Sequence, residues 1–275
     1  MDGLRLNRYS NVIESTGKQI GSLSDMEQVA VLHELIDDTP YKTENYNKYV
    51  HDEYYISHNK SEIIKKAKKR FPLTIKKEIS DCDLIELVSN RKSLRDYANC
   101  SITFEQLSTI VHYSLGIKSV ERGAYGQRNF PFRFCNSAGG LNHLDLYLLI
   151  NNVDGIESGV YYYDFIDDSL IQMDYGNMRS IIGNINYQNE FSVYSNFLAV
   201  VVSDLSRIAP KYCKRAYRMA HVDGGIVTAY LQMLGESVGV SSCVIAGFLE
   251  HELEKLLKLT ESDYPIDTIS FGVRK

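Results

Sequence analysis

The segment FLAVVVSD, residues 197–204, constrains the fold of this chain more than any other feature of its sequence. Its run of branched apolar residues is typical of a β-strand, and neither face of that strand would be polar. Such a strand must lie inside a sheet that is covered on both faces. Residues 242–248, SCVIAGF, have the same character, so we expect two central strands with helices on either side.

Further strand and helix signals follow one another through residues 81–275. Thr103 and Gln106 have the spacing of a capping box that begins a helix, and Gly116 is placed to end it. The segment DLIELVSN predicts a shorter helix that ends before RKSLR. Three more segments are expected to be strands: residues 144–150, 160–164 and 267–273.

Residues 215–238 predict a long buried helix, because their apolar side chains form a wide stripe at helical spacing. Gly224 and Gly225 lie inside it, and each glycine costs about 1 kcal/mol relative to alanine. Close packing of a large group against the backbone would explain them. Gly239 is expected to end the helix. Together these elements predict an α+β domain with one sheet between helices.

The first 80 residues have a different character from the rest of the chain. They are polar, and apolar residues at helical spacing predict helices and loops without a compact core of their own. They contain a basic run at residues 65–77, which is either a solvated helix face or a surface for an acidic peptide or partner. They also carry three scattered histidines: His33, His51 and His58.

The composition excludes several classes of protein. A net charge of −5 gives no reason to expect nucleic acid or an anionic membrane as a partner. The chain has no apolar run long enough for a transmembrane helix and no signal-peptide core, so we expect it in the cytoplasm. Its 5 cysteines lack metal-ligand spacing, which favours reduced thiols and no metal site.

The segment NRKSLRDY is a candidate anion site. Arg91, Ser93 and Arg95 alternate, so an extended backbone would project all three to one side. Two guanidinium groups and a hydroxyl suit a phosphate dianion, which planar forks bind in a bidentate manner. A solvated turn after a helix is the alternative. Arg274, which follows the last apolar strand, would add a further cation or be solvated.

A loop of small residues precedes one predicted strand: Ser137, Ala138, Gly139 and Gly140. The lack of side chains lets a flat ligand approach backbone N–H groups, although an ordinary turn would have the same composition. The chain has neither a GxGxxG fingerprint nor a Walker motif, so a nucleotide would have to be held in another way.

Lys211 and Tyr212 stand side by side just before the long helix. A lysine ammonium lowers the pKa of a neighbouring phenol, because it favours the phenolate. Tyr212 is therefore a candidate general base. The alternative is a surface lysine next to a half-buried tyrosine.

In their order and spacing, these segments from about residue 81 to 275 resemble the nitroreductase-like flavoproteins, specifically the SagB-type azoline dehydrogenase branch. The start of the chain, NRYSNVIESTGK, also looks like the start of this branch. The resemblance implies a nitroreductase-like fold with a mostly antiparallel central sheet, and a homodimer with FMN at the subunit interface. The segments that carry it are RKSLRDY, NSAGGLNHLDLYLLIN, SGVYYYD, KYCKRAYRMAHVDGGIVTAYLQMLGESVGV and CVIAGF with ELEKLLKL.

The resemblance also implies roles for individual residues. The arginines and serine of the family's first motif bind the FMN phosphate and ribityl chain, a loop of small residues lies by the isoalloxazine, and a Lys-Tyr pair is the catalytic signature of the branch. The chain departs from the branch pattern at Asn136, Asn142, His143 and Lys214. The implied cofactor contacts are Arg91, Ser93, Arg95, Ser137, Ala138, Gly139, Gly140, Ala246, Gly247 and Arg274, and the implied catalytic residues are Lys211 and Tyr212.

The implied activity is an FMN-dependent oxidation of thiazoline or oxazoline rings in a precursor peptide to thiazole or oxazole. Such enzymes contribute to the biosynthesis of a ribosomally made modified peptide and act beside a cyclodehydratase. Residues 1–80 are then a candidate docking region, and residues 81–275 the FMN-binding domain. Two alternatives stay open: an NAD(P)H-dependent nitro- or quinone reductase, and a catalytically idle scaffold subunit of a biosynthetic complex.

Overall fold

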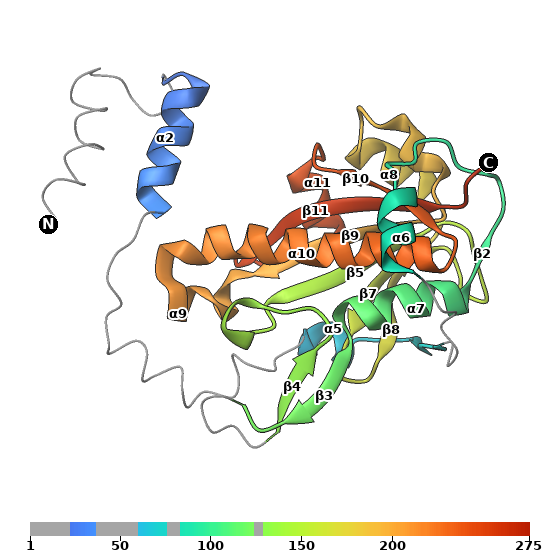
Figure 1. Ribbon diagram of the computed structural model, residues 1–275, viewed down its shortest axis with the longest axis horizontal. Coiled ribbons are helices and arrows are strands. Elements are labelled where there is room, and N and C mark those ends of the chain that lie inside the picture. Colours follow the sequence, from blue (N-terminus) through green and yellow to red (C-terminus); the bar gives the residue numbers. More distant parts are fainter. Residues whose placement is uncertain (1–22, 37–59, 76–82, 124–128) are drawn as a thin grey trace, which may run out of the picture.

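The computed structural model describes residues 23–36, 60–75, 83–123 and 129–275 (Figure 1). Some expectations fall outside these ranges, namely those for residues 7–18, His51 and His58.

Seven strands of the described chain form the main sheet, in the spatial order β1-β8-β7-β5-β9-β11-β10. Every pair of neighbours in it is antiparallel, which agrees with the predicted sheet. These strands are β1 (Arg70–Pro72), β5 (Leu144–Ile150), β7 (Gly159–Asp164), β8 (Ser169–Tyr175), β9 (Phe197–Asp204), β10 (Ser241–Ile245) and β11 (Asp263–Gly272). Two short ribbons lie outside the sheet: β2 (Ile102–Thr103) with β6 (Val153–Asp154), and β3 (Ile117–Glu121) with β4 (Phe130–Arg133).

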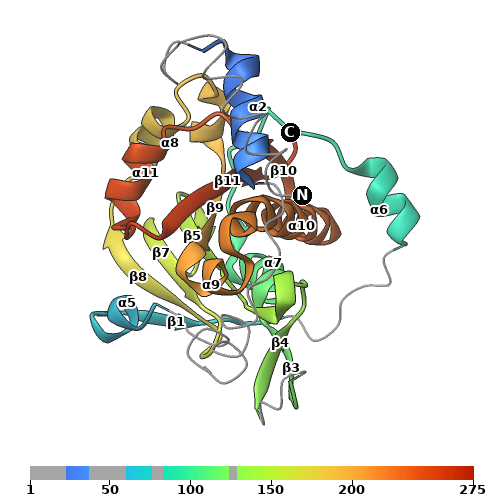
Figure 2. The same ribbon diagram turned by 90° about the vertical axis from the view of Figure 1, so that its left-hand side faces the viewer.

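Helices cover both faces of the main sheet, which confirms the predicted sandwich (Figure 2). One layer consists of α7 (Phe104–Leu115) and α10 (Ala216–Ser237), and the other of α5 (Ser61–Lys65), α8 (Arg179–Ile185) and α11 (Glu250–Leu257). None of the helices in the described ranges has the length and apolar character needed to cross a membrane. The remaining helices are α2 (Asp25–Ile36), α6 (Leu84–Asn90) and α9 (Ala209–Tyr212), and the 3-10 turns are η2 (Ala138–Gly140), η3 (Glu190–Tyr194), η4 (Leu205–Arg207) and η5 (Cys213–Arg215).

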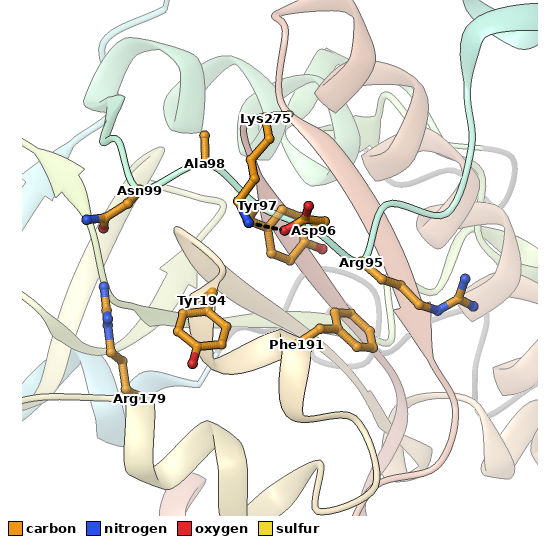
Figure 3. Close-up of a pocket in the computed structure, with 9 residues that line it drawn as sticks. All are labelled: Arg95, Asp96, Tyr97, Ala98, Asn99, Arg179, Phe191, Tyr194 and Lys275. Carbon is orange, nitrogen blue, oxygen red and sulfur yellow. Dashed lines mark hydrogen bonds and ion pairs between the residues drawn. The ribbon is translucent and has the colours of Figure 1, made fainter.

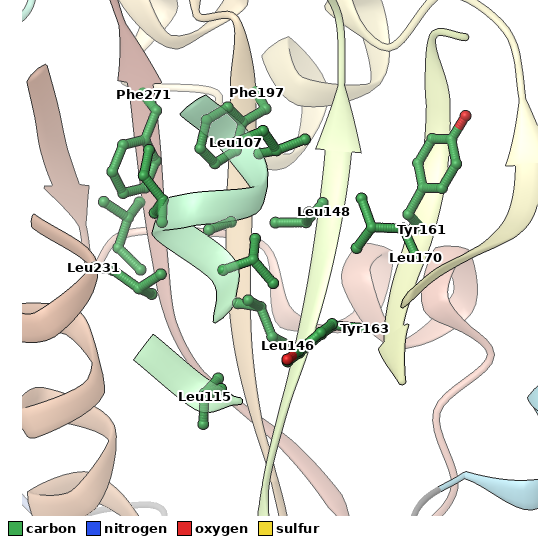
Figure 4. Close-up of a cluster of buried hydrophobic side chains, with 14 of the residues drawn as sticks. Leu107, Leu115, Leu146, Leu148, Tyr161, Tyr163, Leu170, Phe197, Leu231 and Phe271 are labelled. Atoms are coloured by element: carbon green, nitrogen blue, oxygen red, sulfur yellow. The ribbon is translucent and has the colours of Figure 1, made fainter. Parts of the chain in front are cut away.

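Strand β9 lies in the interior of the sheet, as its sequence predicts. Ala199 and Val201 point into the apolar cluster under α7 and α10, whereas Leu198 and Val200 point into the cluster on the opposite face. Each fully buried Val or Leu side chain contributes about 1.5–3 kcal/mol to stability. Figure 4 shows the first of these clusters, in which the Phe197 and Phe271 rings stack at 4.6 Å.

The second predicted central strand, β10, lies at the edge of the sheet, so that expectation was wrong. Its apolar residues are covered by helical layers on both faces, and its free edge is covered by the segment that follows α6. The backbone N–H of Leu94 donates to the carbonyl of Ser242 at 3.0 Å. The strand also ends at Ile245, so Ala246 and Gly247 belong to the loop before α11.

The predicted helix ends agree with the structure. The Asp83 carboxylate caps α6 by accepting the N–H groups of the first turn. Thr103 and Gln106 form the capping box of α7, with hydrogen bonds of 3.1 and 2.9 Å in the two directions. Gly116 is the C-cap of that helix.

The two glycines inside α10 differ in their surroundings. A Cβ atom on Gly224 would lie 2.5 Å from Ile266 Cγ2, so the expected close packing against the helix backbone occurs there. A Cβ atom on Gly225 would have no described atom within 4 Å. Only Gly224 is therefore explained by packing within the chain.

Residues 70–72 form the edge strand β1, where the sequence had predicted only helices and loops. The strand pairs with β8, and the Phe71 ring packs edge-on against Tyr161 at 5.8 Å. This apolar contact within the basic run explains the difference. The division of the chain at residue 80 stays a prediction, although part of the proposed extension belongs to the main sheet.

Candidate active site

The Lys211–Tyr212 pair lies in α9, a single helical turn that follows β9 and η4. The backbone N–H groups of both residues donate to the Ile208 carbonyl, at 3.1 and 2.9 Å. The Lys211 residue is 8% exposed, and its Nζ lies 5.2 Å from the centre of the Tyr212 ring. The segment thus holds an ammonium close to a phenol in a largely buried place.

The same pair lies against the small-residue loop at Gly139. A Cβ atom on Gly139 would be 2.7 Å from Lys211 Nζ and closer still to Tyr212 Oη. Gly139 also has a φ of +58°, in the left-handed region that favours glycine. Two segments that are about 70 residues apart in the sequence therefore meet, and a side chain at position 139 would require the ends of Lys211 and Tyr212 to move.

The loop is fixed from behind by Asp223 of α10. Its Oδ2 accepts the N–H of Ala138 at 2.5 Å and lies 2.8 Å from Nε2 of the fully buried His143. The His143 Nδ1 lies 3.0 Å from Ser203 Oγ. Our sequence reasoning did not assign roles to Asp223 and His143. The sequence did contain one sign of such a role, because Asp223 is a carboxylate within the apolar stripe of the long helix.

A small apolar cluster supports the pair and the loop from below. It joins β4, the loop, the segment before α9 and the start of α10, and Tyr212 packs against it. Cys213, immediately after the pair, has a φ of +50°, which is unfavourable for a residue with a side chain. Strain of this kind is often kept where a backbone must be held in a special conformation. The buried members of the cluster are Phe130, Leu141, Ile208, Ala216 and Ala220.

The Arg91–Arg95 segment lies elsewhere, along the free edge of β10. Burial raises the pKa of the Cys243 thiol, while the nearby Arg95 charge and a hydrogen bond with Ser93 oppose that rise. Ser93 and Arg95 are exposed and Arg91 is half-buried. Within the described ranges, neither arginine takes part in an ion pair, so both guanidinium groups are available to an anion.

Arg95 lines a pocket of about 560 Å³ that opens between the α6–β2 connection and η3 (Figure 3). Its guanidinium lies 5.9 Å from the centre of the Phe191 ring. Three cations and one carboxylate line the pocket, so its charge suits an anion. The lining residues are Arg95, Asp96, Tyr97, Ala98, Asn99, Arg179, Phe191, Tyr194 and Lys275.

Arg274 does not share that pocket with Arg95. Its Nε donates to Ser241 Oγ at 2.7 Å, and its Nη2 donates to Glu236 Oε2 at 2.8 Å. It lines a second pocket, of about 540 Å³, together with Glu236. The guanidinium is therefore held by a carboxylate, although its side chain remains 39% exposed.

The structure separates the predicted site residues into two groups. β11 runs from Asp263, opposite Asp204 near the Lys-Tyr pair, to Gly272, opposite Ser241 near Arg274. At about 3.3 Å per residue, the two ends of the strand lie roughly 30 Å apart. Figure 1 shows α9 and the C-terminus at opposite ends of α10. Ala246 and Gly247 are exposed and follow the end of β10, between the two groups.

Comparisons with known proteins place this arrangement in a family. The Nitroreductase family matches residues 88–273. A protein of Methanocaldococcus jannaschii, named provisionally as a nitroreductase, is 24% identical over 195 residues, which cover 71% of this chain and 93% of that protein.

Solved structures show the same fold. A crystal structure from Anabaena variabilis, described provisionally as a nitroreductase, has a TM-score of 0.62 and 20% identity over 75% of this chain; the match spans 42% of that longer chain. A chain of the Escherichia coli microcin synthetase McbBCD complex, with truncated pro-MccB17 bound, has a TM-score of 0.54 and 18% identity; the match covers 80% of this chain and 83% of that one. Since the family match takes in well over half of the sequence, the chain belongs to the nitroreductase family of oxidoreductases.

Proposed function

We propose that this protein is an FMN-dependent dehydrogenase that oxidises thiazoline or oxazoline rings in a precursor peptide to thiazoles or oxazoles. The observation that carries the proposal is the contact of Lys211 and Tyr212 with Gly139. It places a candidate proton acceptor beside the loop that the family resemblance assigns to the flavin ring. Membership of an oxidoreductase family whose members are typically flavin-dependent supports the redox chemistry.

The types of residue present suit FMN, since cations and a hydroxyl can bind its phosphate and small residues can lie against its ring. Without a side chain, Gly139 lets the loop backbone lie against Lys211 and Tyr212, and the backbone at Gly247 is exposed with no described atom within 4 Å of a Cβ position. Arg91, Ser93 and Arg95 would hold the phosphate and ribityl chain. The loop from Ser137 to Gly140 would lie beside the ring, and the backbone at Ala246 and Gly247 would offer further contacts. Arg274 already donates to Glu236, so it would contact the phosphate while keeping that bond.

The separation of the two groups supports a homodimer with FMN at the subunit interface. Roughly 30 Å is longer than an extended riboflavin phosphate, so one chain would not supply both groups to one cofactor. A second copy of the chain would bring its Lys-Tyr end to the arginine end of the first. Exposed apolar side chains on α6 and α10 support such an interface: Leu84, Ile85, Val88, Val222 and Tyr230.

The proposed reaction removes two hydrogens from adjacent ring atoms, one of them as a proton. When bound, FMN supplies a two-electron acceptor. The Tyr212 phenolate oxygen takes the proton from the ring carbon, and the adjacent Lys211 ammonium favours that phenolate or shares the proton. The gain of ring aromaticity drives the reaction. The apolar cluster beneath Tyr212 keeps water from its buried side.

The proposed partners are a precursor peptide and a cyclodehydratase that forms the azoline. The fold is shared with a chain of the microcin synthetase complex, which was solved with truncated pro-MccB17 bound, and this supports a peptide substrate. Residues 1–80 are the proposed docking region. Deleting residues 1–59, which leaves Lys60 and β1 in place, should weaken binding of the cyclodehydratase and leave the flavin content unchanged.

The test starts with the visible spectrum and the identity of any released flavin, followed by assays on azoline peptides. Lys211→Met and Tyr212→Phe should each lower turnover by about 100-fold or more while FMN stays bound. Lys214→Met and Tyr217→Phe, which change exposed neighbours of the same residue types, should keep activity. A colourless protein that also refuses added FMN, or full activity in the first two variants, would overturn the proposal.

The family match and the name of the Methanocaldococcus jannaschii relative favour a second candidate, an NAD(P)H-dependent nitro- or quinone reductase. This enzyme would not need Lys211 or Tyr212. Rapid bleaching of the bound flavin by NADH, equal in the wild type and in both variants, would select it. A scaffold role would instead predict that a reconstituted complex keeps its activity when both residues are changed.

A further inference from the structure

A buried ionic cluster lies beside the segment that carries Lys211 and Tyr212. Three strands of the main sheet each carry a carboxylate there, at or next to one end: Asp145 of β5, Asp204 of β9 and Asp263 of β11. Two cations face them, Arg207 and Lys60. Buried carboxylates are costly unless they are paired, so the cluster depends on both cations.

Arg207 links the cluster to the small-residue loop. It is 1% exposed, its Nη2 lies 3.0 Å from Asp145 Oδ2, and its Nε lies 3.3 Å from Asp204 Oδ2. Its Nη1 donates to the Asn142 carbonyl at 2.9 Å, and the Asn142 N–H donates to Ser137 Oγ at 3.1 Å. One guanidinium therefore joins the segment before α9 to the loop that meets the Lys-Tyr pair.

Lys60 enters the cluster from the N-terminal part of the chain. Its Nζ donates to Asp204 Oδ2 at 3.2 Å and to Asp263 Oδ1, and it lies 3.9 Å from Asp145 Oδ2. Burial works to lower the pKa of Lys60, but the three carboxylates outweigh it and hold that pKa above its ordinary value. Its backbone N–H also donates to Tyr162 Oη at 3.1 Å. The residue is thus a charged anchor, held at both its backbone and its side chain.

Asp204 connects Lys60 to the segment that leads to the Lys-Tyr pair. While Oδ2 faces Lys60 and Arg207, Oδ1 accepts the Ser206 N–H at 3.0 Å and the Ser206 hydroxyl at 2.6 Å, which begins η4. The chain then reaches Ile208, whose carbonyl accepts the N–H groups of both Lys211 and Tyr212. Hydrogen bonds at both ends and the backbone of residues 206–208 between them therefore link Lys60 to the pair.

We propose that Lys60 is a positioning residue for Lys211 and Tyr212, acting through Asp204 and the turn that follows it. The inference rests on the proposed function, because it concerns the same pair. It gives part of the N-terminal region a task inside the active site, in addition to docking. The other described part of that region supports it, since α2 contacts η5, the turn directly after Tyr212.

Hydrogen exchange of the full-length protein tests this inference independently of activity. Lys60→Met should speed exchange of the amides in residues 205–215 by about tenfold, because their local opening is no longer resisted. Peptides from β5 and β9 should show a smaller increase, which reports only the lower global stability of the variant. Lys60→Arg should restore protection. Lys66→Met, a change at a lysine of the same segment whose side chain is 80% exposed, is the matched control.

Kinetics on azoline peptides give the second reading. If Lys60 positions the pair, Lys60→Met should lower kcat by about tenfold and leave KM and the FMN content close to wild-type values. A protein that never oxidises azolines would fail this assay in its wild-type form as well. The exchange experiment would still decide the role of Lys60 in that case.

Three outcomes would overturn the inference. One is unchanged exchange in residues 205–215 of Lys60→Met, and another is an equal increase across the whole sheet. If Lys60→Met does not fold, Asp263→Asn serves instead, because it removes one partner of Lys60 and leaves two carboxylates facing two cations. The third outcome that would overturn the inference is unchanged exchange of residues 205–215 in Asp263→Asn.

Discussion

His143 and Asp223 form a buried pair, with Nε2 2.8 Å from Oδ2, and the same carboxylate oxygen accepts the backbone N–H of Ala138. Replacing Asp223 with alanine would leave the buried His143 Nε2 and the half-buried Ala138 N–H without this acceptor. We expect a loss of roughly 2–4 kcal/mol in the free energy of unfolding, measured by urea denaturation, and weaker FMN binding because the loop loosens. Asp223→Asn should recover part of both. His221→Ala, an exposed change on the same helix, should alter neither.

Gly139→Ala should separate the loop from the Lys-Tyr pair. The φ of +58° would be strained for alanine, and the added Cβ would displace the ends of the Lys211 and Tyr212 side chains. We expect FMN affinity and azoline turnover to fall together, as measured by flavin titration and by mass spectrometry of the peptide. Unchanged values of both would mean that the loop does not form the cofactor site.

The two glycines of α10 should respond to alanine in opposite directions. Gly224→Ala would drive a Cβ into Ile266 and should destabilise the protein by about 1–3 kcal/mol, as overpacking does. Gly225→Ala meets no described atom within 4 Å and should stabilise the helix by about 1 kcal/mol. Thermal unfolding of the two variants checks the pair. Equal destabilisation would indicate that something covers Gly225 in the assembled protein.

The ionic cluster predicts how stability depends on pH. Burial works to raise the pKa of Asp204, but Arg207 and Lys60 outweigh it and hold that pKa below its ordinary value. The folded state therefore binds this proton less readily than the unfolded state, so the stabilisation is present at neutral pH and is lost as pH falls below about 4. At alkaline pH the raised pKa of Lys60 has the corresponding effect. The folded state holds this proton more tightly than the unfolded state, so the stabilisation is lost as pH rises above about 10.

Lys60→Met tests that dependence. Removing this cation should cost about 1 kcal/mol at neutral pH, less than the loss of a fully buried partner, because the Lys60 side chain is 14% exposed and Arg207 still faces Asp145 and Asp204. The alkaline loss assigned to Lys60 should disappear, and the acid-side dependence should become shallower. Urea midpoints measured across pH for wild type and variant give the difference. Parallel curves would show that Lys60 does not set the charge balance of the cluster.

The proposed homodimer predicts an asymmetry between two valines of equal exposure. Val222 on α10 and Val120 on β3 are both 57% exposed. Val222→Glu places a charge on the proposed interface, so sedimentation should show a shift toward monomer together with loss of bound FMN. Val120→Glu, on the hairpin of β3 and β4, should change neither. A dimer that survives Val222→Glu would move the interface away from this face of α10.

Much of the fold could be predicted because its signals are local. The pattern of residues 144–150 and 197–204 predicted β5 and β9 with their observed bounds, and the Thr103–Gln106 spacing predicted a cap. The edge position of β10 could not be predicted in this way. Its apolar residues indicate only that both faces of the strand are covered. Its place in the order of strands depends on pairing with β11, which leaves no local pattern.

The candidate site divides along the same line. The resemblance identified Lys211, Tyr212 and Gly139, and the structure brings them together. Lys60 could not be found from sequence, because its partners Asp204 and Asp263 lie 144 and 203 residues away and leave no local pattern. The ion pair between Glu236 and Arg274 could not be predicted for the same reason, since 38 residues separate the two.

The pairing of β1 with β8 also bears on the solubility of shortened forms of the protein. A chain that began at residue 81 would keep the fully buried residues of both apolar clusters but would lose α5 and Arg70–Pro72, leaving the backbone N–H and C=O groups along the outer edge of β8 without partners. An open strand edge recruits strands from other molecules. Such a chain would be prone to self-association through β8, and its aggregation would have to be distinguished from any loss of docking.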